Sequence, residues 1–195
     1  FKVGEEILSA TFERFAPQGY EVTKAPYPII SYQQAMLEFG TDKPDLRNPL
    51  IITDATEFFR NSGFSVYDNK VAEGEQVRGI LVKGIADKPR SFFDKLDSYA
   101  KEADMGGMAY IALSSNGAKG ISRFFSEEKL AEAKKFFGLQ DGDAVLLMVG
   151  EVNKLNKFAG QTRIKLGTEL DLTEKDAFRF CWIVDFPMFE KNEET

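Results

Sequence analysis

AVLLMVGE (residues 144–151) is the most apolar strand candidate in the chain, and it follows the turn signal Asp141-Gly142-Asp143. A short apolar run bounded by turn residues is typical of a buried strand. Further strand candidates precede it along the chain: FSVYD (64–68), VRGILVKGI (77–85) and MAYIALS (108–114). Together these runs predict one sheet.

Two amphipathic helices alternate with the strands. SFFDKLDSYAKEADM (91–105) carries an apolar stripe, and SEEKLAEAKKFFG (126–138) begins at a serine cap and ends at a glycine. The order from Phe64 to about Glu151 is strand, strand, helix, strand, helix, strand. This order predicts a small α+β unit with a mixed or antiparallel sheet and helices on one face.

The segments on either side predict separate pieces of structure. Helical spacing covers 3–15 and 152–172, a shorter helix is expected at 31–40, and FRFCWIVDFPMFE (178–190) indicates a bulky apolar strand. We therefore expect three parts: 1–63, the α+β unit at 64–151, and 152–195.

Composition excludes several kinds of chemistry. The 195 residues include no histidine and one cysteine, so they form no imidazole-based catalytic triad, internal disulfide or multi-cysteine metal cluster. The net charge of −6 argues against a uniformly basic surface for nucleic acid. A single cysteine and no run of membrane-spanning length indicate a cytoplasmic protein without a membrane partner.

The loop TDKPDLR (41–47) places two acids and two bases around one proline. It has two interpretations. Lys43 and Arg47 could hold an anion, because a guanidinium grips phosphate or carboxylate with two hydrogen bonds. Alternatively, Asp42 and Asp45 neutralise the two bases and accept hydrogen bonds from nearby amides.

A second basic cluster lies in the connection and helix at 118–137, where cations alternate with phenylalanines. Such a cluster could contact an RNA backbone or stack a base. The alternative is a solvated helix face with buried aromatic rings, since glutamates lie among the lysines at helical spacing. The residues concerned are Lys119, Arg123, Lys129, Lys134, Lys135, Phe124, Phe125, Phe136 and Phe137.

Two motifs resemble one family. GTDKPDLRNP (40–49) and the W-x-x-D-F-P-M-F-E run (182–190) are similar to segments of bacterial-type aspartyl-tRNA synthetases. The intervening sequence has the same order of motifs, with MGGMAYIAL, KGISRFF and DGDAVLLMVGE resembling an insertion domain that also occurs in an amidotransferase subunit. GQTRIKLGTEL (160–170) resembles the helix that returns to the catalytic core.

The resemblance implies an insertion domain with flanking pieces of a class II catalytic core. It implies that the intact enzyme uses ATP and Mg²⁺ to activate L-aspartate, transfers it to tRNA, and forms a homodimer. The family's catalytic residues would lie outside this sequence, so we expect no catalytic residue, metal ligand or bound cofactor here and no activity from the chain alone.

The resemblance also suggests contacts with RNA. Asp42, Lys43, Asp45 and Arg47 match a loop near the catalytic core, where they would shape the mouth of the active site or approach the tRNA acceptor end. Lys119 and Arg123 on the inserted domain are the candidate contacts to the tRNA backbone. The alternative function is a stand-alone module that binds protein or RNA without catalysis.

Overall fold

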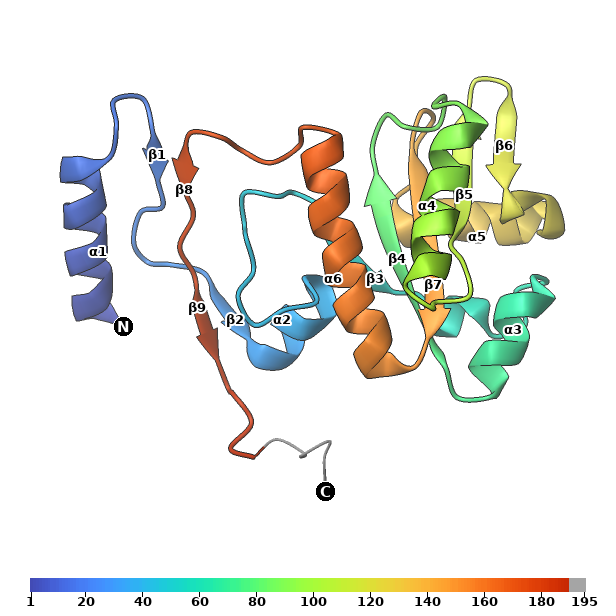
Figure 1. Ribbon diagram of the computed structural model, residues 1–195, viewed down its shortest axis with the longest axis horizontal. Coiled ribbons are helices and arrows are strands. Elements are labelled where there is room, and N and C mark those ends of the chain that lie inside the picture. The colour runs from blue at the N-terminus through green and yellow to red at the C-terminus, as the bar shows by residue number, and fades with distance from the viewer. Residues whose placement is uncertain (190–195) are drawn as a thin grey trace.

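A computed structural model describes residues 1–189, and its main element is a five-stranded antiparallel sheet. The strand order is β3-β4-β7-β5-β6, with β7 in the centre (Figure 1). The strands are β3 (Ile52–Asp54), β4 (Gln76–Val82), β5 (Ala109–Ser114), β6 (Gly117–Gly120) and β7 (Ala144–Gly150). The α+β class predicted from the sequence is confirmed.

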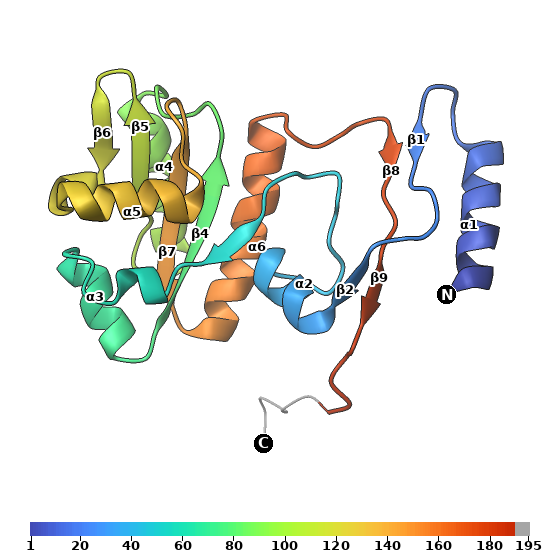
Figure 2. The ribbon, with the colours of Figure 1, turned by 180° about the vertical axis from the view of Figure 1, so that it is seen from behind.

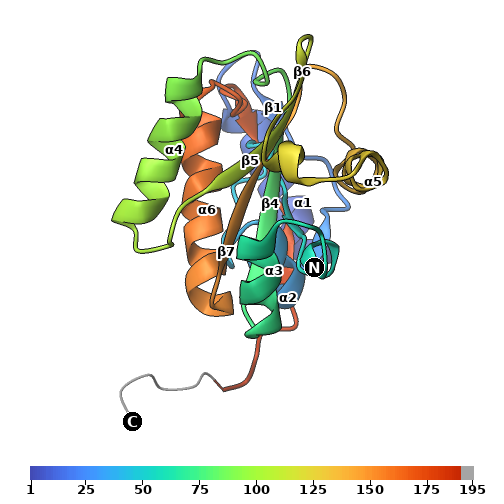
Figure 3. The same cartoon turned by 90° about the vertical axis from the view of Figure 1, so that its right-hand side faces the viewer.

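Helices cover both faces of this sheet, so the prediction of helices on one face is wrong (Figure 3). One face packs against α4 (Arg90–Glu102) and α6 (Val152–Glu169), and the other against α3 (Ser65–Ala72) and α5 (Glu127–Phe137). The reason lies in β7, whose side chains from Ala144 to Val149 are all buried. A strand that is apolar on both sides requires a layer of structure on each.

Residues 65–68 are helical and Phe64 caps the helix, so the strand predicted at 64–68 is wrong. Tyr67 and Val71, four residues apart in α3, are both buried in the core. The Tyr67 hydroxyl donates to the Leu147 carbonyl at 2.7 Å and ties the helix to β7. The carboxylate of Asp68 accepts from the amide and hydroxyl of Ser62, which fixes the turn before the helix. Tertiary packing thus overrides the local alternation of apolar residues.

The structure has two edge strands that the sequence pattern does not predict, and one predicted strand is much shorter than expected. β3 is followed by a 3₁₀ turn at Glu57–Phe59, and β6 is followed by a 3₁₀ turn at Ile121–Phe124, within the connection before α5. In place of the strand predicted at 178–190 the structure has β8 (Ala177–Phe178), which begins one residue earlier, and β9 (Trp182–Val184), and Glu190 lies outside the described residues.

The segments before and after the sheet pair with each other (Figure 2). β1 (Glu21–Val22) runs parallel to β8, and β2 (Ile29–Ser31) runs parallel to β9. α1 (Lys2–Phe15) contacts β1, and α2 (Tyr32–Glu38) follows β2 and contacts β3. The chain therefore leaves this paired region, builds the sheet domain and returns to the same region.

Candidate functional site

The loop 41–47 follows α2 and stands at the surface. Lys43 has a side chain that is 83% exposed, and its ammonium lies 2.7 Å from the Asp42 carboxylate. The Thr41 hydroxyl accepts from the Lys43 amide at 3.2 Å. These contacts hold a polar turn whose lysine still faces solvent.

Asp45 and Arg47 form a two-pronged ion pair in the same loop. Nε of Arg47 donates to Oδ1 of Asp45 at 2.9 Å, and Nη2 donates to Oδ2 at 2.7 Å. The hydrogen bond from the guanidinium lowers the pKa of Asp45 and raises the pKa of Arg47. Of the two interpretations of this loop, the contacts agree with the one in which Asp42 and Asp45 neutralise Lys43 and Arg47. A role of the loop in binding RNA stays a prediction.

The loop is held on α6 by residues that were not among the predicted site. Arg163, which is 1% exposed, donates to the carbonyls of Asp45 at 3.0 Å and Asn48 at 2.7 Å, and also to the carbonyl of Leu50. In return, Nδ2 of Asn48 donates to the Arg163 carbonyl at 2.9 Å. The available signal was the spacing of Gly160, Arg163 and Gly167, which places all three on one helix face.

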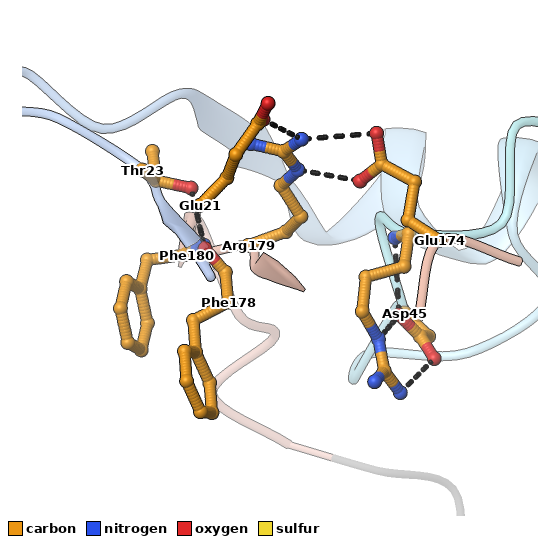
Figure 4. Close-up of polar contacts among 8 residues, drawn as sticks. Glu21, Thr23, Asp45, Glu174, Phe178, Arg179 and Phe180 are labelled. Carbon is orange, nitrogen blue, oxygen red and sulfur yellow. Dashed lines mark hydrogen bonds and ion pairs between the residues drawn. The ribbon is translucent and has the colours of Figure 1, made fainter. Parts of the chain in front are cut away.

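A second set of contacts joins the loop to the strands of the paired region (Figure 4). Arg179 donates to Glu174 at 2.6 and 2.9 Å and to Glu21 at 2.7 Å, and these two carboxylates raise its pKa. The Glu174 amide donates to the Arg47 carbonyl at 3.1 Å. The loop, the segment after α6 and β1 are thus connected through charged side chains at the surface.

A hollow of about 460 Å³ lies between the loop and the end of α6. Its lining includes Arg47, Asn48, Gly167, Glu174 and Lys175. Lys175 lies 2.8 Å from Asp171, and Arg47 is held by Asp45, so the two surface cations at this hollow each have a carboxylate partner. The hollow has mixed charge and is not a ready-made anion site.

Lys119 belongs to β6 and Arg123 to the 3₁₀ turn that follows it; β6 is the edge strand at the end of the sheet far from α2 (Figures 1 and 2). Lys119 on β6 is 3.7 Å from Asp87, and the Arg123 guanidinium lies 4.8 Å from the ring centroid of Phe124. Phe124 is 47% exposed, whereas Phe137 is buried. The interpretation of these aromatics as core holds for some of the rings only, and the two groups of predicted site residues form separate surfaces.

Other reactive groups add little to the site. Cys181 is half-buried, and burial raises the pKa of its thiol. Among residues 1–189, no group of three or more His, Cys, Asp or Glu side chains is placed to hold a metal ion. No helix in this part of the chain is long and apolar enough to cross a membrane.

The comparisons with known proteins give the class first. A family model described as the GAD domain matches residues 67–159, which include β4 to β7 and the first part of α6. The whole chain is also 47% identical to the aspartate–tRNA(Asp/Asn) ligases of Gluconobacter oxydans and Paramagnetospirillum magneticum, and 44% identical to that of Rickettsia bellii. It covers 33%, 22% and 32% of those proteins.

These similarities confirm the resemblance found in the sequence. Residues 67–159 are similar to the GAD domain, and the chain is similar over its whole length to a segment of aspartate–tRNA ligases. The chain spans about a third or less of the length of these relatives.

Proposed function

We propose that this chain is the part of an aspartate–tRNA(Asp/Asn) ligase that contains the GAD domain and adjoining pieces of the catalytic domain. The observation that carries the proposal is the pairing of β1 with β8 and of β2 with β9. This pairing makes residues before and after the sheet one structural region, which is what an inserted domain requires. The match to the relatives over both of these segments supports it.

The boundaries of the three parts belong to this proposal. The predicted insertion at 64–151 agrees approximately with the family match at 67–159. However, β3 at 52–54 joins the sheet and α6 packs on it, so the sheet domain uses residues from both neighbouring parts. We propose that the insertion and the catalytic pieces share these two elements.

In the proposed ligase, L-aspartate is activated with ATP and then transferred to tRNA, and Mg²⁺ would stabilise the phosphate charge. The described side chains do not form a metal-binding group. The resemblance places the family's catalytic residues outside this sequence, so we assign no step of the activation chemistry to the residues described. A cytoplasmic location and a homodimer of the full-length protein are further parts of the proposal.

This chain's own contribution would be to contact tRNA at two surfaces. Lys43 and Arg47 would face the acceptor end, and Lys119 and Arg123 on the GAD domain would meet the backbone. All four cations lie at the surface close to a carboxylate or an aromatic ring, so RNA phosphates would compete with neighbours that are already in place. Such contacts orient RNA without reading its sequence.

The test uses the full-length protein that carries this chain. Wild type should support aspartate-dependent ATP–pyrophosphate exchange and aspartylation of a tRNA(Asp) transcript, whereas residues 1–195 alone should support neither. The double variant Lys43→Ala/Arg47→Ala should raise the KM for tRNA about tenfold, as expected for two lost phosphate contacts, and leave exchange unchanged.

The control is Lys95→Ala, which removes one exposed positive charge from α4. It should leave both reactions at the wild-type level. Exchange activity from residues 1–195 alone, or no aspartylation by the full-length protein, would contradict the proposed function. An unchanged KM in the double variant would contradict the assignment of the loop while leaving the ligase assignment intact.

A further inference from the structure

Arg163 is almost completely buried, and its hydrogen bonds all go to backbone carbonyls between Asp45 and Leu50, in the loop 41–47 and the residues that directly follow it. Among the residues that the structure describes, no carboxylate forms an ion pair with it. Removing a guanidinium from water is costly unless its N–H groups find acceptors. The carbonyls of Asp45, Asn48 and Leu50 supply those acceptors, so the charge is stable only while the loop keeps this shape.

The loop also approaches the backbone of α6 on both sides of Arg163. A Cβ atom built on Gly40 would lie 2.6 Å from the Cα of Gly160, which leaves no space for a side chain between loop and helix. At the other end, Asn48 packs against Gly167. The two glycines and the arginine form a docking face on α6, which we call the Gly160–Gly167 face.

The opposite side of α6 belongs to the core of the GAD domain. Leu155, Phe158, Ala159 and Leu166 are buried there against the sheet. The same helix therefore packs on the GAD domain with one side and holds the loop with the other. Lys43 and Arg47 extend from the outer part of this loop, where they are exposed or half-exposed.

We propose that Arg163 is a positioning residue for tRNA: it fixes the loop carbonyls on the Gly160–Gly167 face and so sets where Lys43 and Arg47 meet the acceptor end. This inference rests on the proposed function. A lysine would retain the charge but not the planar fork that reaches three carbonyls at once. The arrangement thus requires arginine rather than any buried cation.

The test compares Arg163→Lys with Arg78→Lys in the full-length ligase. Arg78 is a suitable control because it is 2% exposed and hydrogen-bonded to Asn156 of α6, yet it makes no hydrogen bond to the loop 41–50. For Arg163→Lys we expect the KM for a tRNA(Asp) transcript to rise about tenfold, with exchange unchanged, as for the loss of one charge-assisted contact. For Arg78→Lys we expect a KM within about twofold of wild type.

Limited trypsin digestion provides a readout that does not depend on RNA. Cleavage after Arg47 in residues 1–195 should be at least about tenfold faster in Arg163→Lys than in wild type, because the loop loses its anchor. If Arg163→Lys does not fold, as judged by circular dichroism, Asn48→Ala tests the same anchor from the loop side. It removes the bond to the Arg163 carbonyl and should also speed this cleavage.

The outcomes separate the two proposals. Equal cleavage after Arg47 in wild type and in the folded anchor variant would overturn the positioning role. An equal rise in KM for Arg78→Lys and Arg163→Lys would also overturn it, because general destabilisation would then explain the effect. Faster cleavage without any change in KM would overturn the role in tRNA positioning, whereas absence of aspartylation by wild type would refute the proposed function itself.

Discussion

Replacing Gly40 with alanine should destabilise the protein much more than the same change at Gly138. Both glycines have left-handed backbone, with φ of +70° and +67°. A Cβ at Gly138 would meet no atom within 4 Å, whereas at Gly40 it would lie 2.6 Å from the Cα of Gly160 and 2.7 Å from its amide nitrogen. Comparing Gly40→Ala with Gly138→Ala therefore separates the cost of backbone strain, which both variants share, from the cost of steric overlap, which only Gly40→Ala has.

The expected magnitudes follow from these two effects. Left-handed backbone costs an alanine about 1 kcal/mol, which applies to both variants. Overlap with the rigid backbone of α6 adds about 1–3 kcal/mol at Gly40 only. We expect the free energy of unfolding to fall by about 1 kcal/mol in Gly138→Ala and by about 2–4 kcal/mol in Gly40→Ala.

Urea-induced unfolding followed by circular dichroism provides the measurement. Equal losses in the two variants would refute the close approach of the loop to α6, because strain alone would then account for both. A loss at Gly40 accompanied by faster trypsin cleavage after Arg47 would agree with displacement of the loop.

Two further predictions concern single hydrogen bonds. Tyr67→Phe removes the buried hydroxyl that donates to Leu147, and it should lower the free energy of unfolding by about 1 kcal/mol in urea titrations; no change would contradict that bond. The carboxylate of Glu5 accepts a hydrogen bond from Nε1 of Trp182 at 2.9 Å and another from a backbone amide, and these bonds lower the pKa of Glu5. Its contribution to the free energy of unfolding is therefore complete above about pH 4.3, the ordinary pKa of glutamate, and is lost as the pH falls through the lowered pKa. The fluorescence of this single tryptophan should change only below about pH 4.3, and Glu5→Gln should abolish the transition; a midpoint at or above that pH would contradict the assignment.

The sequence pattern predicted the helices and the strand whose apolar residues form a clear periodic stripe or a continuous run. The apolar run at 144–150 forms the central strand, and the amphipathic stripes at 91–105 and 126–138 form α4 and α5. Pattern alone could not show that both sides of β7 are covered, because a continuous apolar run has no alternation to reveal its two faces. It also missed β6, a short strand containing two glycines at the sheet edge, whose pairing with β5 is set by tertiary contacts.

In the candidate site, too, the local contacts could be predicted from the sequence and the long-range contacts could not. The charges of the loop and their local pairing follow from residues only one or two positions apart, such as Asp45 and Arg47. The anchor does not, because Arg163 and Asn48 are separated by 115 positions and the arginine lies in an ordinary helical sequence. The spacing of Gly160, Arg163 and Gly167 shows that these residues share a helix face, but it does not show which distant segment packs on that face.

The parallel pairing of β2 with β9 has a consequence for modularity. The chain leaves β2 at Ser31 and enters β9 at Trp182, whose register partner is Ile29 at the other end of β2, so the intervening region must connect opposite ends of the pair. The same geometry sets a limit for engineering: a linker that replaces the region between the two strands must cross from one end of the pair to the other, so a two-residue turn cannot close it.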